Sequence, residues 1–432
     1  MPGRFGRHVA VRSGLPQVRP QPAARSAQGS PVNELRIEGA RRWGDPAPTA
    51  LAIRGGRIVA LGADADAQPA SATIDARGQL VLPGLVDGHA HLDKTLWGER
   101  WHPHQAGPTI AERIDNERRV LRGLKLSAAR QSARLLRHMV ARGTTHVRTH
   151  VDVGPEMRLA HLHDLLHTRA ACAGAVDMQI VAFPQGGVVR QPGTLDLLDA
   201  AVREGADAIG GIDPSALDGD AAGQLDGIFA IASRRDCELD LHLHERGEQG
   251  ARSIGMICDR TQALGLNGRV AIGHAFCLGE LPPAALDPLL ERLAMLDIAV
   301  MTHAPGGYMP FPPVRRLAEA GVHLFTGSDG VRDTWTPMNT GDLLERAYLV
   351  AYNSGFRDDA GLELALGMAT WGGARVMRAP DYGLDVGCCA DLVLVEAECA
   401  AEAVAAHPPR RLVLKRGRIV AREGVALLPA AA

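Results

Sequence analysis

Histidines gather in short blocks at the ends of apolar runs in this sequence. One run ends with His89 and His91, and another ends with His242, His244 and Glu245. Because residues two apart in an extended strand point to the same side, each pair of histidines can face one ion. Imidazole nitrogens are common ligands of zinc and ferrous iron, and they also carry protons near neutral pH. The spacing therefore predicts metal-assisted chemistry.

Two single residues complete this pattern. His274 follows a glycine at the end of another apolar run, and Asp329 follows Ser328 at the end of the last run. Three neutral imidazoles and one carboxylate suit zinc or ferrous iron and leave a coordination position for a water molecule. These residues are far apart in the sequence, so the fold must bring the ends of several strands together.

The elements that position these residues are apolar, β-rich runs separated by helical stretches. The longest helical stretch is expected over residues 110–142. Eight such alternations predict an α/β fold, a (β/α)8 TIM barrel, in which chemistry lies at the carboxyl ends of the strands. The expected strands are Val81–Leu92, Thr145–Val153, Asp177–Gln185, Ala206–Asp213, Glu238–Glu245, Val270–His274, Ile298–His303 and His323–Asp329.

The two ends of the chain are expected to build a small β-sandwich domain together. The sequence RGGRIVALG from Arg54 resembles KRGRIVAREG from Lys415, and neither end has enough strands to bury a face alone. This predicts a composite β domain over 33–82 plus 376–432 and a hydrolase barrel over 83–375. Residues 1–32 hold five arginines and no acidic residue, which favours a disordered tail. A targeting segment or a wrongly placed start site are the alternatives for this stretch.

Composition excludes several classes of protein. With 47 Lys+Arg against 49 Asp+Glu the chain lacks the basic surface of a general nucleic-acid binder. No apolar run approaches the ~20 residues that a membrane helix needs. The seven cysteines are odd in number and contain no C-x-x-C pair, which favours reduced thiols and a cytoplasmic location. The expected partners are a small molecule and water, with a homo-oligomer possible and neither nucleic acid nor membrane bound.

The segment Pro83–His91, which follows a glycine-rich β segment, resembles the start of the barrel in the amidohydrolase superfamily. Within that superfamily the chain is most similar to the cytosine deaminase-like subfamily, which includes bacterial cytosine deaminase and N-isopropylammelide aminohydrolase relatives. The resemblance runs from about residue 50 to 425. Its further blocks are His146–Val153, Gln179–Gln185, the His242/Glu245 pair, Gly273-His274, and Asp329 followed by Trp335.

The resemblance implies a set of metal ligands: His89, His91, His242 and Asp329. The ion would lower the pKa of its bound water, so that hydroxide is available at neutral pH. Asp329 would also accept the proton of that water. Some amidohydrolases bridge two metals with a carboxylated lysine on the fourth strand. The only lysines here are 94, 125 and 415, so we expect one divalent ion per chain, Fe²⁺ or Zn²⁺.

The remaining roles follow from the same resemblance. Glu245 would move a proton onto the ring nitrogen beside the attacked carbon, and His274 would hydrogen-bond the attacking water or the oxyanion. Gln185 would read the carbonyl and N–H edge of the ring, and Trp335 would wall the pocket. His244 and His150 are candidate substrate contacts by their place at strand ends. Histidines 102, 104, 161, 163 and 167 are expected at the surface.

Three departures from cytosine deaminase bear on the substrate. Gly330 follows the metal-ligand Asp where that enzyme has a second Asp, Leu243-His244 replaces Cys-Asp, and the fourth strand ends in Gly211-Ile212-Asp213-Pro214. We expect an aminohydrolase that removes an exocyclic amine from a cytosine-like heterocycle and releases ammonia. The alternatives are an N-alkylamino s-triazine (isopropylammelide-type) aminohydrolase and a cyclic-amide hydrolase. A non-catalytic barrel is least favoured because the ligands and Glu245 are all present.

Overall fold

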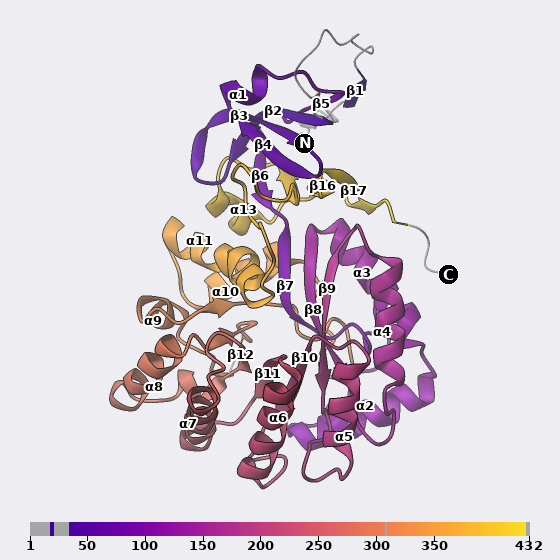
Figure 1. Cartoon of the computed structure of the whole chain (residues 1–432), viewed down its shortest axis with the longest axis vertical. Helices are drawn as coiled ribbons and strands as arrows, with labels where there is room; N and C mark the ends of the chain where they lie inside the picture. Colours follow the sequence, from indigo (N-terminus) through magenta and orange to yellow (C-terminus); the bar gives the residue numbers. More distant parts are fainter. Residues whose placement is uncertain (1–17, 21–33, 307–308, 429–432) are drawn as a thin grey trace, which may run out of the picture.

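The first apolar run of the sequence divides between two sheets. In the computed structural model, which describes residues 18–20, 34–306 and 309–428, this run forms β6 (Leu80–Pro83) and β7 (Leu85–Ala90). Gly84 joins the two strands, and a Cβ atom there would collide with the side chain of Thr145. Glycine thus lets the chain pass closely beside the next strand as it leaves the upper sheet of Figure 1 and enters the barrel below.

The barrel is a parallel sheet whose strands follow one another in sequence order from β7 to β14. Backbone hydrogen bonds join its two edges: the Asp329 N–H donates to the His89 carbonyl (2.8 Å), and the His91 N–H donates to the Asp329 carbonyl (3.3 Å). The predicted (β/α)8 barrel is confirmed, and each expected run overlaps one strand of the barrel. After β7 these are β8 (Thr144–Asp152), β9 (Asp177–Phe183), β10 (Ala208–Ile212), β11 (Glu238–Leu243), β12 (Val270–His274), β13 (Ala299–Met301) and β14 (Leu324–Phe325).

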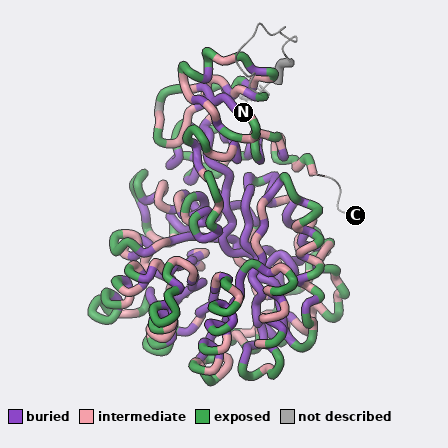
Figure 2. Tube along the Cα trace, viewed as in Figure 1, coloured by how far each residue is buried: buried purple, intermediate pink, exposed green. Residues whose placement is uncertain are grey.

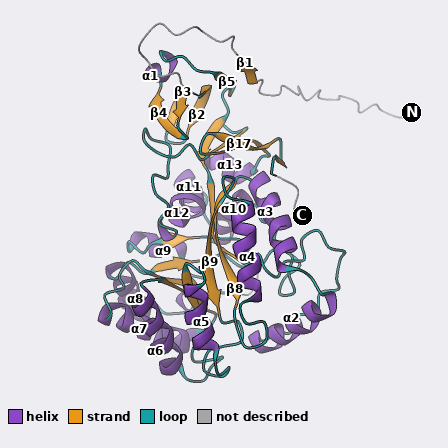
Figure 3. Cartoon of the chain, turned by 45° about the vertical axis from the view of Figure 1, so that its right-hand side comes forward, coloured by secondary structure: helices purple, strands orange, loops and turns teal. Residues whose placement is uncertain are grey.

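Most helices surround this sheet on its outer side (Figures 1 and 3), whereas the first of those given next, α2, contacts the loops at the barrel mouth. They are α2 (Ile110–Leu124), α3 (Ala128–Ala141), α4 (Ala160–Ala171), α5 (Thr194–Arg203), α6 (Ala221–Arg235), α7 (Gly247–Ala263), α8 (Pro283–Met295), α9 (Val314–Glu319), α10 (Leu343–Asn353), α11 (Asp359–Gly367) and α12 (Gly373–Val376). Shorter pieces are α1 (Ala63–Asp66), α13 (Ala400–Ala406) and the single turns Phe276–Gly279 and Met368–Gly372.

The helical stretch expected over residues 110–142 is divided into two helices, α2 and α3. Lys125 adopts a left-handed conformation (φ 51°) and ends α2. Two residues later the Ser127 hydroxyl accepts a hydrogen bond from the Arg130 N–H (3.3 Å) and caps α3. The helical spacing of apolar residues continues across this break, so periodicity alone did not reveal it.

The two chain ends meet in one sheet, as expected. Strand β15 (Leu392–Val395) lies between β6 and β16, so a C-terminal strand pairs directly with an N-terminal one. The other strands are β1 (Val18–Pro20), β2 (Leu35–Arg42), β3 (Asp45–Arg54), β4 (Arg57–Leu61), β5 (Ala72–Asp75), β16 (Arg410–Lys415), β17 (Arg418–Arg422) and β18 (Val425–Ala426). The two similar sequence pieces are the hairpins β3–β4 and β16–β17, which have turns of the same length.

Most of the expected N-terminal tail, 1–32, lies outside the described residues. Within it Val18–Pro20 forms β1, which pairs with β5. We propose that the domains divide at 82/83 and 375/376, since β6 ends at Pro83 and α12 ends at Val376. Buried residues run through both sheets in Figure 2. In the part of the chain that the structure describes, no helix is long and apolar enough to cross a membrane.

Candidate active site and metal centre

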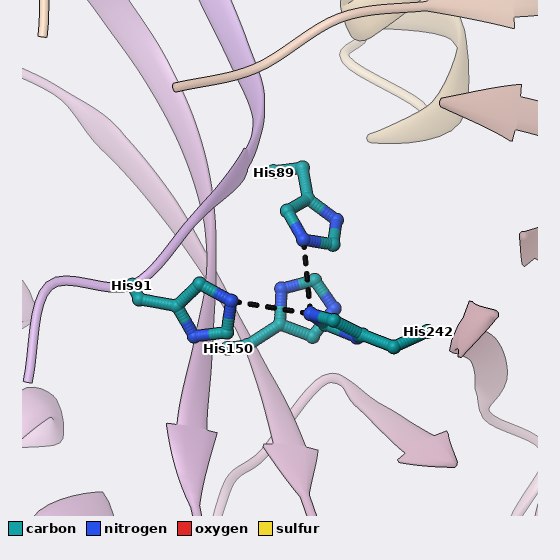
Figure 4. A group of neighbouring side chains, drawn as sticks. All are labelled: His89, His91, His150 and His242. Atoms are coloured by element: carbon teal, nitrogen blue, oxygen red, sulfur yellow. Dashed lines mark hydrogen bonds between the residues drawn. The ribbon is translucent and has the colours of Figure 1, made fainter. Parts of the chain in front are cut away.

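Three imidazoles from two strands converge at the carboxyl end of the barrel (Figure 4). His89 ends β7, His91 follows it, and His242 lies on β11. Nε2 of His242 is 3.1 Å from Nε2 of His89 and 3.1 Å from Nε2 of His91. Asp329 Oδ1 is 3.4 Å from Nε2 of His91. Nitrogens that bind one ion at about 2.1 Å lie at such separations, so the predicted ligands are brought together as a metal site requires.

The chemistry of this group fits a cation better than a set of hydrogen bonds. Burial lowers the pKa of His89 and His242 well below the usual value, so their rings are neutral, which is the form that binds metal. Only one proton at a time can lie between Nε2 of His242 and its two neighbours. Hydrogen bonding therefore leaves part of this group unsatisfied, whereas one divalent ion would satisfy all three nitrogens.

Asp329 and His274 hold unusual backbone conformations beside this group. Their φ angles are 58° and 68°, in the left-handed region that residues with a side chain rarely occupy. Such strain concentrates at functional sites. Burial raises the pKa of Asp329, but the hydrogen bond from His91 and the field of neighbouring imidazoles outweigh it and hold that pKa well below its usual range. Both nitrogens of His274 are buried and have no hydrogen-bond partner among the described residues.

His150, a predicted substrate contact, lies inside the ligand cluster. Its ring centroid is 4.2 Å from that of His89 and 4.6 Å from that of His242. Its Nε2 is 3.4 Å from Asp240 Oδ1, and Arg148 pairs with the same carboxylate. We propose from these ring contacts that His150 packs against the metal ligands from the barrel interior.

His244 forms an ordered pair with Asp213 at the end of β10. Its Nδ1 is 2.8 Å from Asp213 Oδ2, and its ring stacks on His274 with centroids 4.4 Å apart. Burial lowers the pKa of His244, but the Asp213 carboxylate outweighs this effect and raises it above the usual value. The ring of His303 also contacts that of His274, with centroids 5.2 Å apart. We assigned His303 no role from sequence, although its place two residues after β13 is the signal that identified the others.

Glu245, the predicted proton carrier, is buried and held by several donors. Oε1 accepts hydrogen bonds from the N–H groups of Ser215 and Ala216 (2.7 Å each), and Oε2 accepts one from the Ser253 hydroxyl. Burial raises its pKa above the usual value. The carboxylate therefore also fixes the loop after β10 against α7.

Gln185 and Trp335 share a partner that we did not identify from sequence. The Gln185 amide nitrogen lies 3.4 Å from Glu117 Oε1, and the Trp335 indole N–H donates to Glu117 Oε2 (2.7 Å). Lys94 lies 3.8 Å from Glu117 and donates to Asp152 (2.7 Å). A cavity of about 220 Å³ is lined by Lys94, Glu117, Asp152 and Gln185, together with apolar residues of α2 and of the loop after β8, whereas Trp335 is not among its lining residues.

The histidines expected at the surface differ in how far they are exposed. His163 and His167 are exposed, and His102 and His104 are half-buried. The expectation for His161 is wrong, because its Nδ1 lies 3.0 Å from Asp93 Oδ2, its side chain is 27% exposed, and it lines the cavity. This contact depends on the tertiary structure, because the start of α4 lies against the loop after β7.

Gly330 has a local structural reason. A Cβ atom there would collide with the Asp333 carboxylate, which accepts hydrogen bonds from the N–H groups of Trp335 (2.8 Å) and Thr336 (2.9 Å). The absence of a side chain at 330 thus allows Asp333 to fix the backbone of Trp335.

A histidine and aspartate cluster at the mouth of a (β/α)8 barrel is typical of metal-dependent hydrolases. Residues 72–421 match the amidohydrolase family, and the chain belongs to that family. It is a hydrolase that acts on carbon–nitrogen bonds.

The chain is similar to three known proteins in sequence or structure. The chain is 47% identical to N-isopropylammelide isopropylaminohydrolase from Burkholderia multivorans, whose crystal structure superposes with a TM-score of 0.87 over 91% of this chain and 99% of that one. It is 31% identical to N-isopropylammelide isopropyl amidohydrolase of Pseudomonas sp. strain ADP, over 87% of this chain and 94% of that one. The crystal structure of 5-methylcytosine deaminase from Klebsiella pneumoniae is 27% identical, with a TM-score of 0.80 over 90% and 97% of the two chains.

Proposed function

We propose that this protein hydrolyses the bond between a ring carbon and an exocyclic amino or alkylamino nitrogen of an oxo-substituted nitrogen heterocycle. N-alkylamino s-triazines of the isopropylammelide type are the first candidate substrates. The observation that carries this choice is the 47% identity to an N-isopropylammelide isopropylaminohydrolase over nearly the whole of both chains. The departures from cytosine deaminase at Gly330 and His244 favour the same choice.

The reaction adds water across one carbon–nitrogen bond. The water oxygen bonds to the ring carbon, the bond to the exocyclic nitrogen breaks, and the nitrogen leaves as ammonia or an alkylamine with the proton it gains. A divalent ion held by His89, His91, His242 and Asp329 would lower the pKa of the attacking water to about 7. We keep the prediction of one ion per chain, of iron or zinc.

The proton transfers fall to side chains beside these ligands. We assign to Asp329 the acceptance of the proton of the attacking water, because its carboxylate lies beside the ligand nitrogens, with Oδ1 3.4 Å from Nε2 of His91. His274 faces the same point with unpartnered nitrogens and hydrogen-bonds the water or the developing oxyanion. We assign to Glu245 the protonation of the ring nitrogen, as the sequence predicts.

The leaving nitrogen needs a proton of its own, and we assign its delivery to His244. Asp213 binds Nδ1 of His244, which leaves Nε2 as the nitrogen that can meet a substrate. The His244 side chain is 14% exposed and stacks on His274, beside the metal ligands. Gln185 and Trp335 then contact the edge and the face of the ring.

An amine-release assay tests this function. Protein reconstituted with Fe²⁺ or Zn²⁺ is offered N-isopropylammelide, cytosine and 5-methylcytosine, with a cyclic amide as a further probe. Mass spectrometry identifies the amine and the hydroxylated ring. We expect isopropylamine from N-isopropylammelide at the highest kcat/KM. Preferred release of ammonia from cytosine or 5-methylcytosine would instead establish the second candidate, which the similarity to 5-methylcytosine deaminase supports.

A further inference from the structure

Helix α2 buries a carboxylate on its inner face. The helix begins with Thr109 and Glu112 in reciprocal hydrogen bonds and ends at the left-handed Lys125. Its buried residues are Ile114 and Glu117, which lie three apart and so share one face. Glu117 is 2% exposed. A buried carboxylate is costly unless donors surround it, so its contacts indicate why this position holds a glutamate.

Those contacts come from three different loops of the barrel mouth. Trp335 follows β14 and donates its indole N–H to Oε2 (2.7 Å), whereas Gln185 follows β9 and places its amide nitrogen 3.4 Å from Oε1. Lys94 follows β7 and lies 3.8 Å from Oε1. Strands β9 and β14 are separated in the barrel by β8 and β7, which carry metal ligands or their neighbours. One carboxylate thus contacts side chains from the loops that follow β7, β9 and β14.

The arrangement fixes the orientation of two proposed substrate contacts. An indole that donates to a buried carboxylate is held in one rotamer, so the plane of Trp335 is set by Glu117. The amide of Gln185 can present either oxygen or nitrogen to a ring, and the contact of its nitrogen with Glu117 turns the oxygen away from the helix. Asp333 fixes the backbone of Trp335 independently, through the N–H of that residue.

We propose that Glu117 is a positioning residue that holds Trp335 and Gln185 in the geometry that binds the heterocycle. This inference rests on the proposed function for the nature of the substrate. Glu117 acts on binding through its two partners and takes no part in bond cleavage, because the proton carriers lie on other elements. Lys94 neutralises it in part, and Asp152 shares the same ammonium group.

The test compares Glu117→Gln and Glu117→Ala with wild type on the preferred substrate. We expect KM to rise about tenfold to a hundredfold in Glu117→Ala, which leaves the Trp335 indole N–H without its buried acceptor. The value of kcat should stay within about threefold. Glu117→Gln should restore part of the affinity because its amide oxygen can accept from the indole. The control is Asp115→Asn, which removes a carboxylate at an exposed position of the same helix. It should leave both KM and kcat unchanged.

Two further measurements separate positioning from a general structural role. In the double variant Glu117→Ala/Trp335→Phe, the effects of the two single substitutions on KM should be less than additive, because each of them removes the same indole–carboxylate contact. In protein labelled with ¹⁵N-tryptophan, the indole resonance assigned by Trp335→Phe should shift in Glu117→Gln. A KM within twofold of wild type in Glu117→Ala, or a loss confined to kcat, overturns the proposal.

The resonance also distinguishes failure of the two proposals. If wild type turns over none of the heterocycles, the proposed function fails, and the Trp335 resonance still decides the contact. An unmoved resonance in Glu117→Gln then overturns the positioning role, whereas a shifted one supports it.

Discussion

Replacing Glu245 separates its proposed chemistry from its visible structural contacts. Glu245→Gln keeps an oxygen that can accept from the N–H groups of Ser215 and Ala216, and its amide nitrogen can donate to the Ser253 hydroxyl. The hydrogen bonds of the loop after β10 are therefore preserved almost completely. We expect the free energy of unfolding to change by less than about 1 kcal/mol. An amide cannot transfer a carboxyl proton, however, so kcat should fall by about 10² to 10⁴.

Glu245→Ala, unlike Glu245→Gln, should lower both the stability and the turnover of the protein. It leaves two backbone N–H groups and one hydroxyl without their acceptor, and an unsatisfied buried donor costs about 1–3 kcal/mol. Because the loop is partly buried, we expect a total loss of about 3 kcal/mol in the free energy of unfolding, together with the loss of turnover. Glu248→Gln, an exposed change on the first turn of α7, is the matched control and should alter neither quantity.

The assay combines amine release with denaturant unfolding on metal-loaded protein, and bound metal is measured for every variant. A hundredfold fall in kcat corresponds to about 2.7 kcal/mol in the activation barrier. Activity of Glu245→Gln within tenfold of wild type would refute the reasoning. Glu245 would then be an anchor of the loop, and His244 would be the carrier of both proton transfers.

Three further predictions concern the metal, one ion pair and one glycine. Elemental analysis should find one iron or zinc per chain, and two ions per chain would contradict the mononuclear site. Removal of the ion by a chelator should abolish turnover and lower the melting temperature, since a ligand present at 1,000 times its Kd adds about 4 kcal/mol to the free energy of unfolding. Burial lowers the pKa of His161, but Asp93 outweighs this and raises it to about 9, above the unfolded value of about 6.5. The stabilisation by this ion pair is thus complete below about pH 6.5 and is lost as pH rises through about 9. The loss of stability caused by His161→Gln should therefore shrink by about 3 kcal/mol between pH 6 and pH 10. If denaturant unfolding shows the same difference at every pH, the His161–Asp93 ion pair is contradicted. Gly330→Asp should cost about 1–3 kcal/mol of stability and raise KM, because its Cβ displaces Asp333 and with it Trp335; a gain of cytosine turnover with unchanged stability would refute the steric account.

The sequence by itself determined the strands and the groups that end them. The alternation of apolar runs with helices gave the barrel, and strand parity placed His89 beside His91 and His242 beside His244, because both signals depend only on neighbouring residues. Within the helical stretches this reasoning was less informative, because the spacing of apolar residues continues past the residues that end a helix. Lys125 and Ser127 end one helix and begin the next inside a continuous apolar pattern.

Only the tertiary structure decided which distant side chains share a buried environment. Glu117 stands on a polar helix and looks like a solvent-facing residue until α2 is placed over the mouth, where Trp335, Gln185 and Lys94 surround it. His161 and Asp93 likewise meet only when α4 lies against the loop after β7. Strand periodicity is a property of a few consecutive residues, whereas the partner of a buried charge depends on how separate elements come together. The sequence therefore predicted which strand ends carry the histidines and Asp329, but not which residues surround them.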